Sequence, residues 1–543
     1  MDASTRFDTQ RVGALPVIVY FFDQLELAAT IDELVPWEGE VPLGILVEIL
    51  IANRLLQPKA LFRVGLWAQQ AGLTDYYGVS AEELNDDRLG RALERVAAHA
   101  VKIQAALVLK MIKTFKLKVH QLHYDISNVE MYGAYERAAA APKVAGPLPV
   151  YGRTKSGRKN VKQIQFGLNV SADGAVPLGH LPFDGNTAEA KTHLDNLKQL
   201  DQLLPKGTLL YIADTKLDTP ENLLAIAVRD GQFLCGGAFQ PHLQQQYLKL
   251  RDRLKRVDYC PKSQAKLPPE ERDAYHAFEV EDKLYGEVDG RGIRLKYRQI
   301  FVHSEAKAEL EAKTRERHTA KIQVDFEAVE RNLGKYSLKT KEAIIRRLEA
   351  AKARYAAGSL FTYELETKRG KFHLAWRIDE KALRERQQLE GVYMLKTNLP
   401  KKTHPLAEVL ATYKQQSHVE RRIGNLKGPL AVAPMFLEKP ERMAGLLCIL
   451  VWALMIMALM ERAVRKNLKG KPLFGLYPEN RPSPAPTGTA LLECFSTLCI
   501  VIVKHGGTSK RRLAQFTPIQ QKIIQLLAIP PTALQTFKKR CGM

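Results

Sequence analysis

The sequence is poor in cysteine and carries no export signal at its start. Only six of its 543 residues are cysteine, none forms a Cys-x-x-Cys pair, and none has a histidine at zinc-finger spacing. This usage excludes a disulfide-rich secreted scaffold and predicts reduced, mostly buried thiols. The first residues, MDASTRFDTQ, are polar and charged, so we expect no secretory signal. Both absences favour a cytoplasmic protein.

Long uncharged apolar runs are also scarce, with one exception at 443–460, MAGLLCILVWALMIMALM. At 18 residues this run is marginally long enough to cross a membrane. A helix that is buried on all sides within a core is equally apolar. Because the run is single and has charged residues on both flanks, we expect a buried core helix and no membrane contact. A membrane-associated protein built on this run is the alternative.

Acidic residues are under-represented relative to basic ones. Lys and Arg number 81 against 59 Asp and Glu, which gives a formal net charge of +22 and a pI near 9.5. Such an excess is typical of nucleic-acid binders, although a merely basic soluble protein would show it too. The hydrophobic content of 45% is ordinary for a globular chain, and the length suits two to four domains.

Two apolar stretches, 119–127 and 208–214, are typical of buried strands, and each has an aspartate at or near its end. These are Asp125 and Asp214. Sites in open α/β sheets gather at the carboxyl ends of strands, and carboxylate oxygens are the ligands that Mg²⁺ prefers. We therefore expect both residues in a divalent-metal site for phosphoryl transfer. His123 lies on the same strand face as Asp125, and we expect it to be a core histidine.

The stretch 413–427, YKQQSHVERRIGNLK, contains no proline and predicts a single helix. At about 100° per residue, one stripe of this helix carries a phenol, an amide, a carboxylate and an ammonium. They belong to Tyr413, Gln416, Glu420 and Lys427, with Arg421 and Arg422 beside the stripe. A solvated helix face of mixed charge is the alternative. Glu420 would add a third carboxylate to the two strand-end aspartates.

With these residues the chain resembles the DDE transposases of bacterial insertion sequences, and more closely their insertion-sequence-four-like group. That group has a Tyr-x2-Arg-x3-Glu-x6-Lys signature around its last catalytic acid. Tyr413, Glu420 and Lys427 match it at the correct spacing, whereas Gln416 stands where the signature has arginine. The phosphate contact of that arginine is then expected from Arg421 or Arg422. Further similarity lies in 151–158 (YGRTKSGR), 183–186 (FDGN) and 389–398 (LEGVYMLKTN).

The resemblance implies an α/β fold: an RNase H-like mixed-sheet catalytic core, interrupted by a β-rich and helical insertion and preceded by an α-helical N-terminal domain. The core reads as strands at 119–127, 163–170 and 175–183, a helix at 188–204, a strand at 208–214, a helix at 220–230 and a strand at 233–238. The expected parts are a helical domain at 1–115 for end binding or dimerisation, core segments at 116–239 and 389–480, an insertion at 240–388, and a C-terminal segment at 481–543 with a basic loop at 506–512.

The resemblance further implies metal-dependent cleavage at the ends of an insertion sequence, followed by strand transfer into target DNA in a cut-and-paste pathway. Asp125, Asp214 and Glu420 would bind two Mg²⁺ ions, which Mn²⁺ could replace, while Tyr413, Gln416, Arg421, Arg422 and Lys427 would contact DNA. The expected partners are the terminal inverted repeats, target DNA and a second copy of the chain, at the bacterial nucleoid. Relatives use an aromatic residue of the insertion to stabilise a flipped base, and Trp376 is the only tryptophan there. The alternatives are an RNase H-like metal nuclease that does not join DNA, and an inactive DNA-binding relative.

Overall fold

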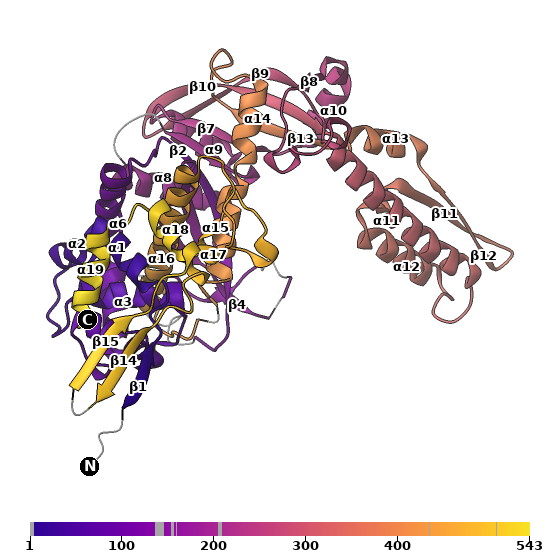
Figure 1. The fold of residues 1–543 in the computed structure, drawn as a ribbon. Coiled ribbons are helices and arrows are strands. Elements are labelled where there is room, and N and C mark those ends of the chain that lie inside the picture. The colour runs from indigo at the N-terminus through magenta and orange to yellow at the C-terminus, as the bar shows by residue number, and fades with distance from the viewer. Residues whose placement is uncertain are drawn as a thin grey trace. The chain divides into compact units, whose positions relative to one another are not determined.

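A computed structural model shows that the chain forms two compact units. It describes residues 5–135, 146–153, 157–158, 160–204, 209–433, 435–505 and 508–543. The first unit comprises Met1–Gln232 and Gln415–Met543, and the second comprises Phe233–Lys414 (Figure 1). Residue 208 of the expected strand 208–214, residues 154–156 of the similar stretch 151–158 and residues 506–507 of the expected basic loop lie outside the described residues.

The first unit begins with a helical region, as the sequence predicts. It contains α1 (Leu15–Leu25), α2 (Leu27–Leu34), α3 (Leu43–Leu56), α4 (Val64–Gln70), α5 (Leu73–Tyr77) and α6 (Asp86–Phe115). The longest helix, α6, starts where the Asn85 side chain accepts a hydrogen bond from Arg88 N at 2.9 Å. The negative charges of Asp86 and Asp87 in its first turn interact favourably with the positive end of the helix dipole and so stabilise the helix.

Glu48 on α3 is a buried carboxyl group within this helical region. It accepts hydrogen bonds from Ala28 N at 3.1 Å and from Tyr77 Oη at 2.7 Å. The pKa of Glu48 is raised from an ordinary value of 4.5 to about 7, and burial is the largest cause of this shift. The unfolded chain therefore loses this proton at lower pH than the folded protein does, so the stability it contributes is complete below pH 4.5 and is lost as pH rises through about 7.

We expect Glu48→Gln to flatten this pH dependence, because the amide oxygen can still accept from Ala28 N and the amide NH2 can donate to Tyr77 Oη, without a buried charge. Relative to the parent protein, the variant should gain about 1–3 kcal/mol in the free energy of unfolding at pH 8 and little at pH 5. Urea unfolding at the two pH values measures the difference. Glu33→Gln, at an exposed position of α2, is the matched control. An equal effect of Glu48→Gln at both pH values would contradict the prediction.

The long apolar run forms the middle of α16 (Pro440–Leu468), and the expectation of a buried core helix is confirmed. By length and composition α16 could cross a membrane, but its most apolar stretch is entirely buried inside the protein. It packs against α3, α6 and the core strand β5. The Trp452 indole N–H donates to Gln104 Oε1 on α6 at 2.7 Å, which satisfies two buried polar groups between the helices.

The sheet of the first unit has the chain order that the sequence predicts. Its strands are β2 (Gln121–Met131), β3 (Val150–Tyr151), β4 (Lys162–Ser171), β5 (Pro177–Asp184) and β6 (Leu210–Ala213), with α8 (Glu189–Leu203) before β6 and α9 (Pro220–Ala227) after it. β4 pairs antiparallel with β5, with β2 and, at its start, with the short β3. β2 also pairs with β6, in parallel. The spatial order β5-β4-β2-β6 places β2 in the interior of the sheet.

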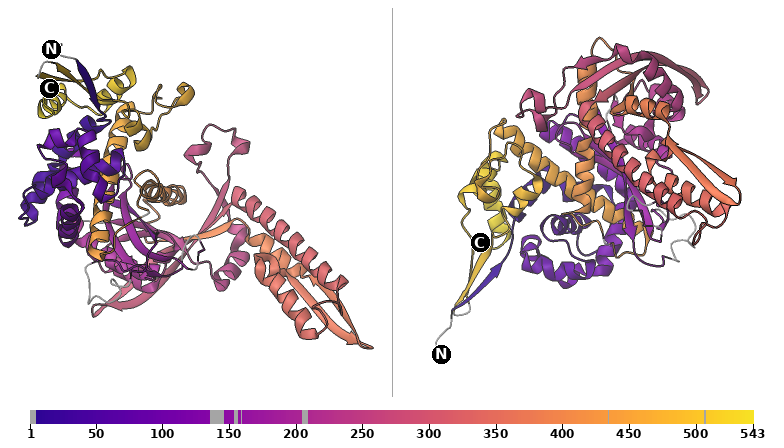
Figure 2. Two further views of the ribbon diagram at one scale, coloured as in Figure 1. Left: turned by 90° about the horizontal axis from the view of Figure 1, so that it is seen from below. Right: turned by 90° about the vertical axis from the view of Figure 1, so that its right-hand side faces the viewer.

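The two ends of the chain form a second sheet in this unit, which the sequence did not predict. β1 (Arg6–Gln10) pairs with β14 (Ile500–His505), and β14 pairs with β15 (Thr508–Leu513), all antiparallel. Residues 508–512 are therefore strand, not loop. Strands from the 1–115 and 481–543 segments therefore pair in one sheet (Figure 2). The remaining C-terminal helices are α17 (Gly488–Glu493), α18 (Pro518–Leu526) and α19 (Pro531–Arg540).

The second unit, Phe233–Lys414, covers a longer stretch of sequence than the insertion expected at 240–388. Its sheet has the order β7-β13-β10-β9-β8, with all neighbours antiparallel. The strands are β7 (Gln232–Gly237), β8 (Lys255–Val257), β9 (Tyr275–Val288), β10 (Arg291–Ser304) and β13 (Val392–Thr397), and the helices flanking them are α10 (Pro241–Leu250) and α14 (Leu406–Lys414). A tight turn joins β9 to β10, and Asp289 and Gly290 both adopt positive φ there.

A small helical and β part of the second unit has its own hydrophobic core. It contains α11 (Glu305–Arg331), α12 (Lys341–Arg354), the hairpin β11 (Phe361–Lys368) and β12 (Lys371–Ile378), and α13 (Glu380–Leu389). Trp376 packs against this core, with its ring centroid 5.8 Å from that of Phe326. Its indole N–H donates to Glu330 Oε2 at 3.1 Å. Trp376 is thus a packing residue here, and the structure gives no support to a flipped-base role.

Candidate active site

The structure brings Asp125 and Asp214 together on neighbouring parallel strands. β2 and β6 pair with Gln121 opposite Leu210 and His123 opposite Ile212. Continued by two residues, this register sets Asp125 beside Asp214, the first residue after β6, which is still extended at φ −73° and ψ −168°. Neighbouring strands lie about 4.8 Å apart, and residues in register project from the same face. The two carboxylates therefore share one face at the carboxyl end of β6.

Each of these carboxylates accepts a backbone hydrogen bond that fixes its direction. Asp125 Oδ1 accepts from Ile126 N at 2.8 Å, and Asp214 Oδ1 accepts from Lys216 N at 2.9 Å. Asp214 thereby caps the short 3-10 turn Thr215–Leu217. Both side chains are only partly buried, so solvent or a ligand can reach them. Hydrogen bonds of this kind orient a carboxylate before it binds a metal ion.

A buried polar network lies between α8 and the strands that carry the two aspartates. Tyr211 Oη accepts from Asn196 Nδ2 at 2.9 Å and bonds with His193 Nδ1 at 3.1 Å. Tyr124 Oη donates to Thr192 Oγ1 at 3.2 Å. Burial raises the pKa of both tyrosines above the usual value, so they stay neutral. Sequence reasoning missed this network, although Thr192, His193 and Asn196 were visible as polar residues on an amphipathic helix.

Glu420 lies on α15 (Ser417–Lys427), which packs against β2 and β4. Its side chain is exposed in the first turn of the helix. Within the described part of the chain, no three His, Cys, Asp or Glu side chains come together in a group that could hold a metal ion. The structure thus places Asp125 on β2 and Asp214 directly after the neighbouring β6, and packs the helix of Glu420 against β2, without gathering the three carboxylates.

The single helix expected at 413–427 is wrong, because a turn at Gln415–Gln416 interrupts it, although Gln416 itself keeps helical backbone angles of φ −54° and ψ −29°. α14 ends at Lys414 and α15 begins at Ser417. At this break the Gln416 side chain is only 8% exposed. Its Nε2 donates to the carbonyl of Tyr124 at 2.8 Å, and its Oε1 bonds with His123 Nδ1 at 3.1 Å. A buried side chain with both amide atoms so engaged does not contact DNA, so this expectation for Gln416 is wrong.

Gln416 instead ties the start of α15 to the strand that carries Asp125. His123, its partner, is a fully buried core histidine, as expected. Burial lowers the pKa of His123 to about 4, so the ring is neutral and its Nδ1–H can donate to the amide oxygen. The tether joins the residue before Asp125 to the residue four positions before Glu420. Gln416, which stands where the resembled signature has arginine, therefore has a structural role in this chain.

We expect Gln416→Ala to lower the free energy of unfolding by about 2–4 kcal/mol, since it leaves two buried polar groups without their partner. Gln416→Arg, which restores the family signature, should be at least as harmful because it buries a guanidinium next to His123. Denaturant unfolding of both variants measures the loss. Gln415→Ala, one residue away at a half-buried position, is the matched control. A Gln416→Arg protein as stable as the parent would contradict the tether.

Arg422 is fully buried, and its guanidinium is used within the protein. It pairs with Glu461 at 2.9 Å and donates to the carbonyls of Ala175 at 2.8 Å and Gly174 at 2.9 Å. These contacts join α15, α16 and the turn between β4 and β5. The expected phosphate contact of Arg422 is wrong for this reason. Arg421 is 44% exposed with a loose 3.8 Å pairing to Glu461.

The other expected DNA contacts have different surroundings. Lys427 is exposed in the last turn of α15, and Tyr413 lies half-buried in α14 of the second unit. Their contact with DNA, like that of Arg421, stays a prediction.

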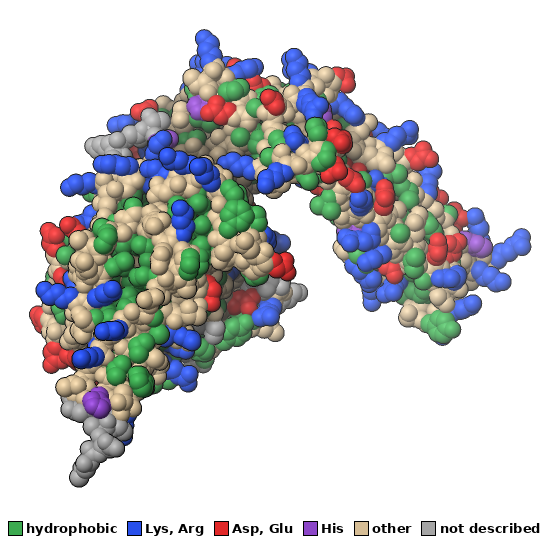
Figure 3. All heavy atoms as spheres, viewed as in Figure 1, with side chains coloured by type: hydrophobic (Ala, Val, Ile, Leu, Met, Phe, Trp, Pro, Cys, Tyr) green, Lys and Arg blue, Asp and Glu red, His purple; other side chains and the backbone are tan. Residues whose placement is uncertain are grey.

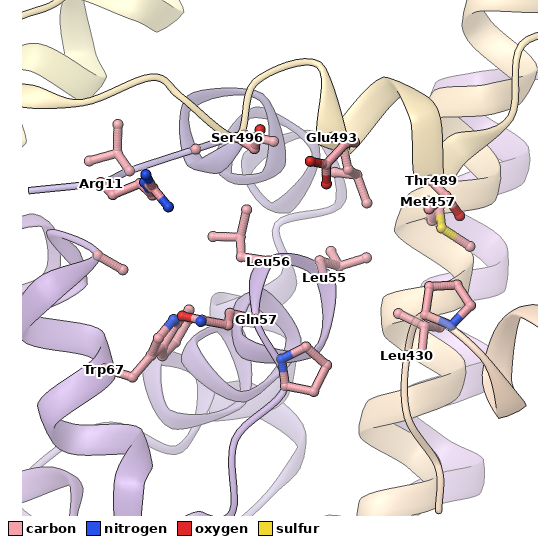
Figure 4. A pocket seen from close by; sticks show the side chains of 17 residues that line it. Arg11, Leu55, Leu56, Gln57, Trp67, Leu430, Met457, Thr489, Glu493 and Ser496 are labelled. Carbon is pink, nitrogen blue, oxygen red and sulfur yellow. The ribbon is translucent and has the colours of Figure 1, made fainter. Parts of the chain in front are cut away.

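A separate pocket of about 290 Å³ lies elsewhere in the first unit, and none of the expected site residues lines it. Its wall combines apolar side chains such as Trp67, Leu55 and Met457 with the polar Arg11 and Glu493 (Figure 4). The described lining contains one carboxylate and no histidine or cysteine. The strand-end aspartates, not this pocket, are therefore the candidate active site.

Comparison with known proteins adds a partial family match. Residues 7–108, from β1 through most of α6, match a domain of unknown function, DUF4277. No curated protein matches the sequence. Among solved structures, the chain is similar to the piggyBac transposase in a cryo-EM structure of its synaptic complex with hairpin DNA, with a TM-score of 0.37 and 7% sequence identity over 99% of this chain and 87% of that chain. The matched domain ends before Asp125, Asp214 and Glu420.

Proposed function

We propose that this protein is a DDE-type DNA transposase that cleaves the ends of an insertion sequence and joins them to target DNA. The observation that carries the proposal is the parallel register of β2 and β6, which, continued by two residues, would set Asp125 beside Asp214. The order β5-β4-β2-β6, with only the last pair parallel, supports an RNase H-like core around them. The motif match of Tyr413, Glu420 and Lys427 supplies the third acid.

The donor atoms of this site suit a hard divalent cation. Two adjacent carboxylates offer oxygen ligands, which Mg²⁺ and Mn²⁺ prefer, and no sulfur or imidazole is among them. Asp125, Asp214 and Glu420 would hold two such ions. Bound there, the ions would activate the attacking oxygen and offset the charge that develops on the phosphate. Glu420 is exposed at the start of α15, so its side chain would complete the set by turning toward the aspartates.

The protein's own contribution is positioning and charge. Hydrogen bonds of Tyr124 and Tyr211 fix β2 and β6 to α8. The hydrogen bond from Gln416 to Tyr124 fixes the start of α15 to β2. Arg421 and Lys427 would attract the phosphate backbone beside the scissile bond. Lys and Arg side chains are spread over the face shown in Figure 3, as the charge of +22 leads one to expect. Pairing two DNA ends would bring two copies of the chain together, in the bacterial cytoplasm.

One observation favours a second candidate function. Glu420 is not gathered with the two aspartates, as a catalytically inactive, DNA-binding relative would also show. The two candidates differ in one measurable property, which is metal-dependent cleavage.

The deciding experiment offers the protein a plasmid that carries its gene with native flanks. Purified protein is added with Mg²⁺, with Mn²⁺ or with EDTA, and the products are mapped. Breaks at the two element boundaries that require metal support the transposase, and joined products separate it from a metal nuclease that only cuts. Binding without cleavage under either metal would overturn the catalytic proposal in favour of the DNA-binding relative.

A further inference from the structure

The sheet built from the two chain ends has one face against the protein and one face exposed. On the inner face, Ile500 and Ile502 are buried. Gln10 and Arg511 on that face both donate to Asp75 of α5, at 2.7 and 2.8 Å, which fixes the sheet to the helical region. Side chains alternate between the two faces along each strand, so their immediate neighbours in sequence project outward.

The outward face displays six side chains in two rows across the three strands. The register aligns Phe7 with Val503 and Lys510 in one row, and Thr9 with Val501 and Arg512 in the next. Phe7 is 69% exposed, and Thr9, Lys510 and Arg512 are exposed as well. None of the six is acidic. Phe7 and Val503 therefore share a row with Lys510, and Arg512 lies in the adjacent row, so the face combines apolar and cationic side chains.

The charge of the surrounding strands has the same sign. Residues 5–11 and 500–513 contain six Lys or Arg residues against one acidic residue, Asp8. Asp8 is itself paired with Lys504 at 2.8 Å. A second copy of this chain, at +22, would meet repulsion at such a surface, whereas a polyanion would be attracted. Phosphate contacts from Lys and Arg, with an aromatic ring nearby, are a common way for a β-sheet to hold nucleic acid.

We propose that this outward face, formed by Phe7, Thr9, Val501, Val503, Lys510 and Arg512, is a DNA-binding surface distinct from the carboxylate site. Lys510 and Arg512 contact backbone phosphates, and Phe7 makes an apolar contact with the DNA. The choice of DNA over another polyanion rests on the proposed function. The binding itself does not depend on cleavage, so it is testable in a protein that cannot cut.

The test measures the affinity of full-length Asp125→Asn protein for a fluorescent DNA duplex at several salt concentrations. Adding Lys510→Gln and Arg512→Gln should weaken binding at least tenfold and reduce the slope of log affinity against log salt by about 2, since each phosphate contact contributes about 0.9. Adding Phe7→Ala alone should weaken binding without changing the slope. Lys466→Gln with Lys522→Gln, which changes two exposed lysines of the same unit, is the matched control and should change neither value.

Thermal unfolding of each variant checks that the exposed substitutions leave the fold intact. Unchanged affinity and slope in the Lys510→Gln/Arg512→Gln protein overturn the proposal. So does a change in oligomeric state with unchanged DNA affinity, which would make the face a protein interface. Failure of the catalytic proposal appears elsewhere, as an absence of cleavage by the parent protein, so the two results are separable.

Discussion

Asp125→Asn and Asp214→Asn are each expected to slow DNA-end cleavage by at least about a thousandfold, or about 4 kcal/mol in the activation barrier. The amide is isosteric, so its oxygen keeps the hydrogen bond from Ile126 N or Lys216 N and the local backbone stays in place. It lacks the charge that holds a divalent cation. The rate of boundary cleavage with Mg²⁺ measures the loss, and DNA affinity should change less than about twofold, because positive side chains supply most of it.

The matched control is Asp195→Asn, which removes an exposed carboxylate from α8 in the same unit. It should cleave at the parental rate. Glu420→Gln extends the test to the acid that the structure does not gather with the others. A loss as large as that of Asp125→Asn would show that Glu420 joins the site during the reaction, whereas parental activity would remove it from the catalytic set. Parental cleavage by both aspartate variants would end the proposal of a carboxylate-held metal site.

The strands that carry the two aspartates were predictable because their signals are local. Apolar runs that stop at an acid mark buried strands, and the order of strands and helices between 119 and 230 follows the sequence prediction closely. The pairing of β2 with β6 joins residues about ninety positions apart, but a parallel pair with a helix between them is the usual connection. The sequence could therefore anticipate that Asp125 and Asp214 would meet.

The break at Gln415–Gln416 was not predictable from local signals. No glycine or proline marks it, and the hydrogen bonds that accompany it reach His123 and Tyr124, nearly three hundred positions earlier in the chain. The sheet of β1, β14 and β15 was not predictable for the same reason, since its pairing joins the two ends of the chain. Contacts of this separation are set by the tertiary fold, and propensity within a short window does not contain them.

The burial of Arg422 has a local signal in the sequence of α15. Val419, Ile423 and Leu426 are the buried apolar residues of α15, and Arg422 lies three positions after the first and four before the last. The helical period thus places Arg422 on the buried face, away from solvent. An arginine there requires a buried partner, and Glu461, at 3% exposure within the long apolar helix α16, provides it.

Arg422→Met is expected to lower the free energy of unfolding by about 3–5 kcal/mol, although methionine fills much of the same volume. The loss has two sources. Glu461 loses its fully buried partner and keeps the partly exposed Arg465 at 2.5 Å, and the carbonyls of Ala175 and Gly174 lose their donor. Denaturant unfolding of the full chain measures the change. Because Arg422 does not reach solvent, DNA affinity of the folded variant should stay at the parental value.

A double-mutant cycle separates the ion pair from the packing around it. Glu461→Gln alone leaves the Arg422 charge buried, whereas Arg422→Met with Glu461→Gln removes both charges, so the double variant should lose less stability than the sum of the single losses. Arg421→Ala is the control for a surface charge near the same carboxylate. Its 3.8 Å pairing at 44% exposure predicts a loss below about 1 kcal/mol. A loss of that small size for Arg422→Met would show that the guanidinium does not clamp α15 to α16, and its assignment as a structural residue would have to be withdrawn.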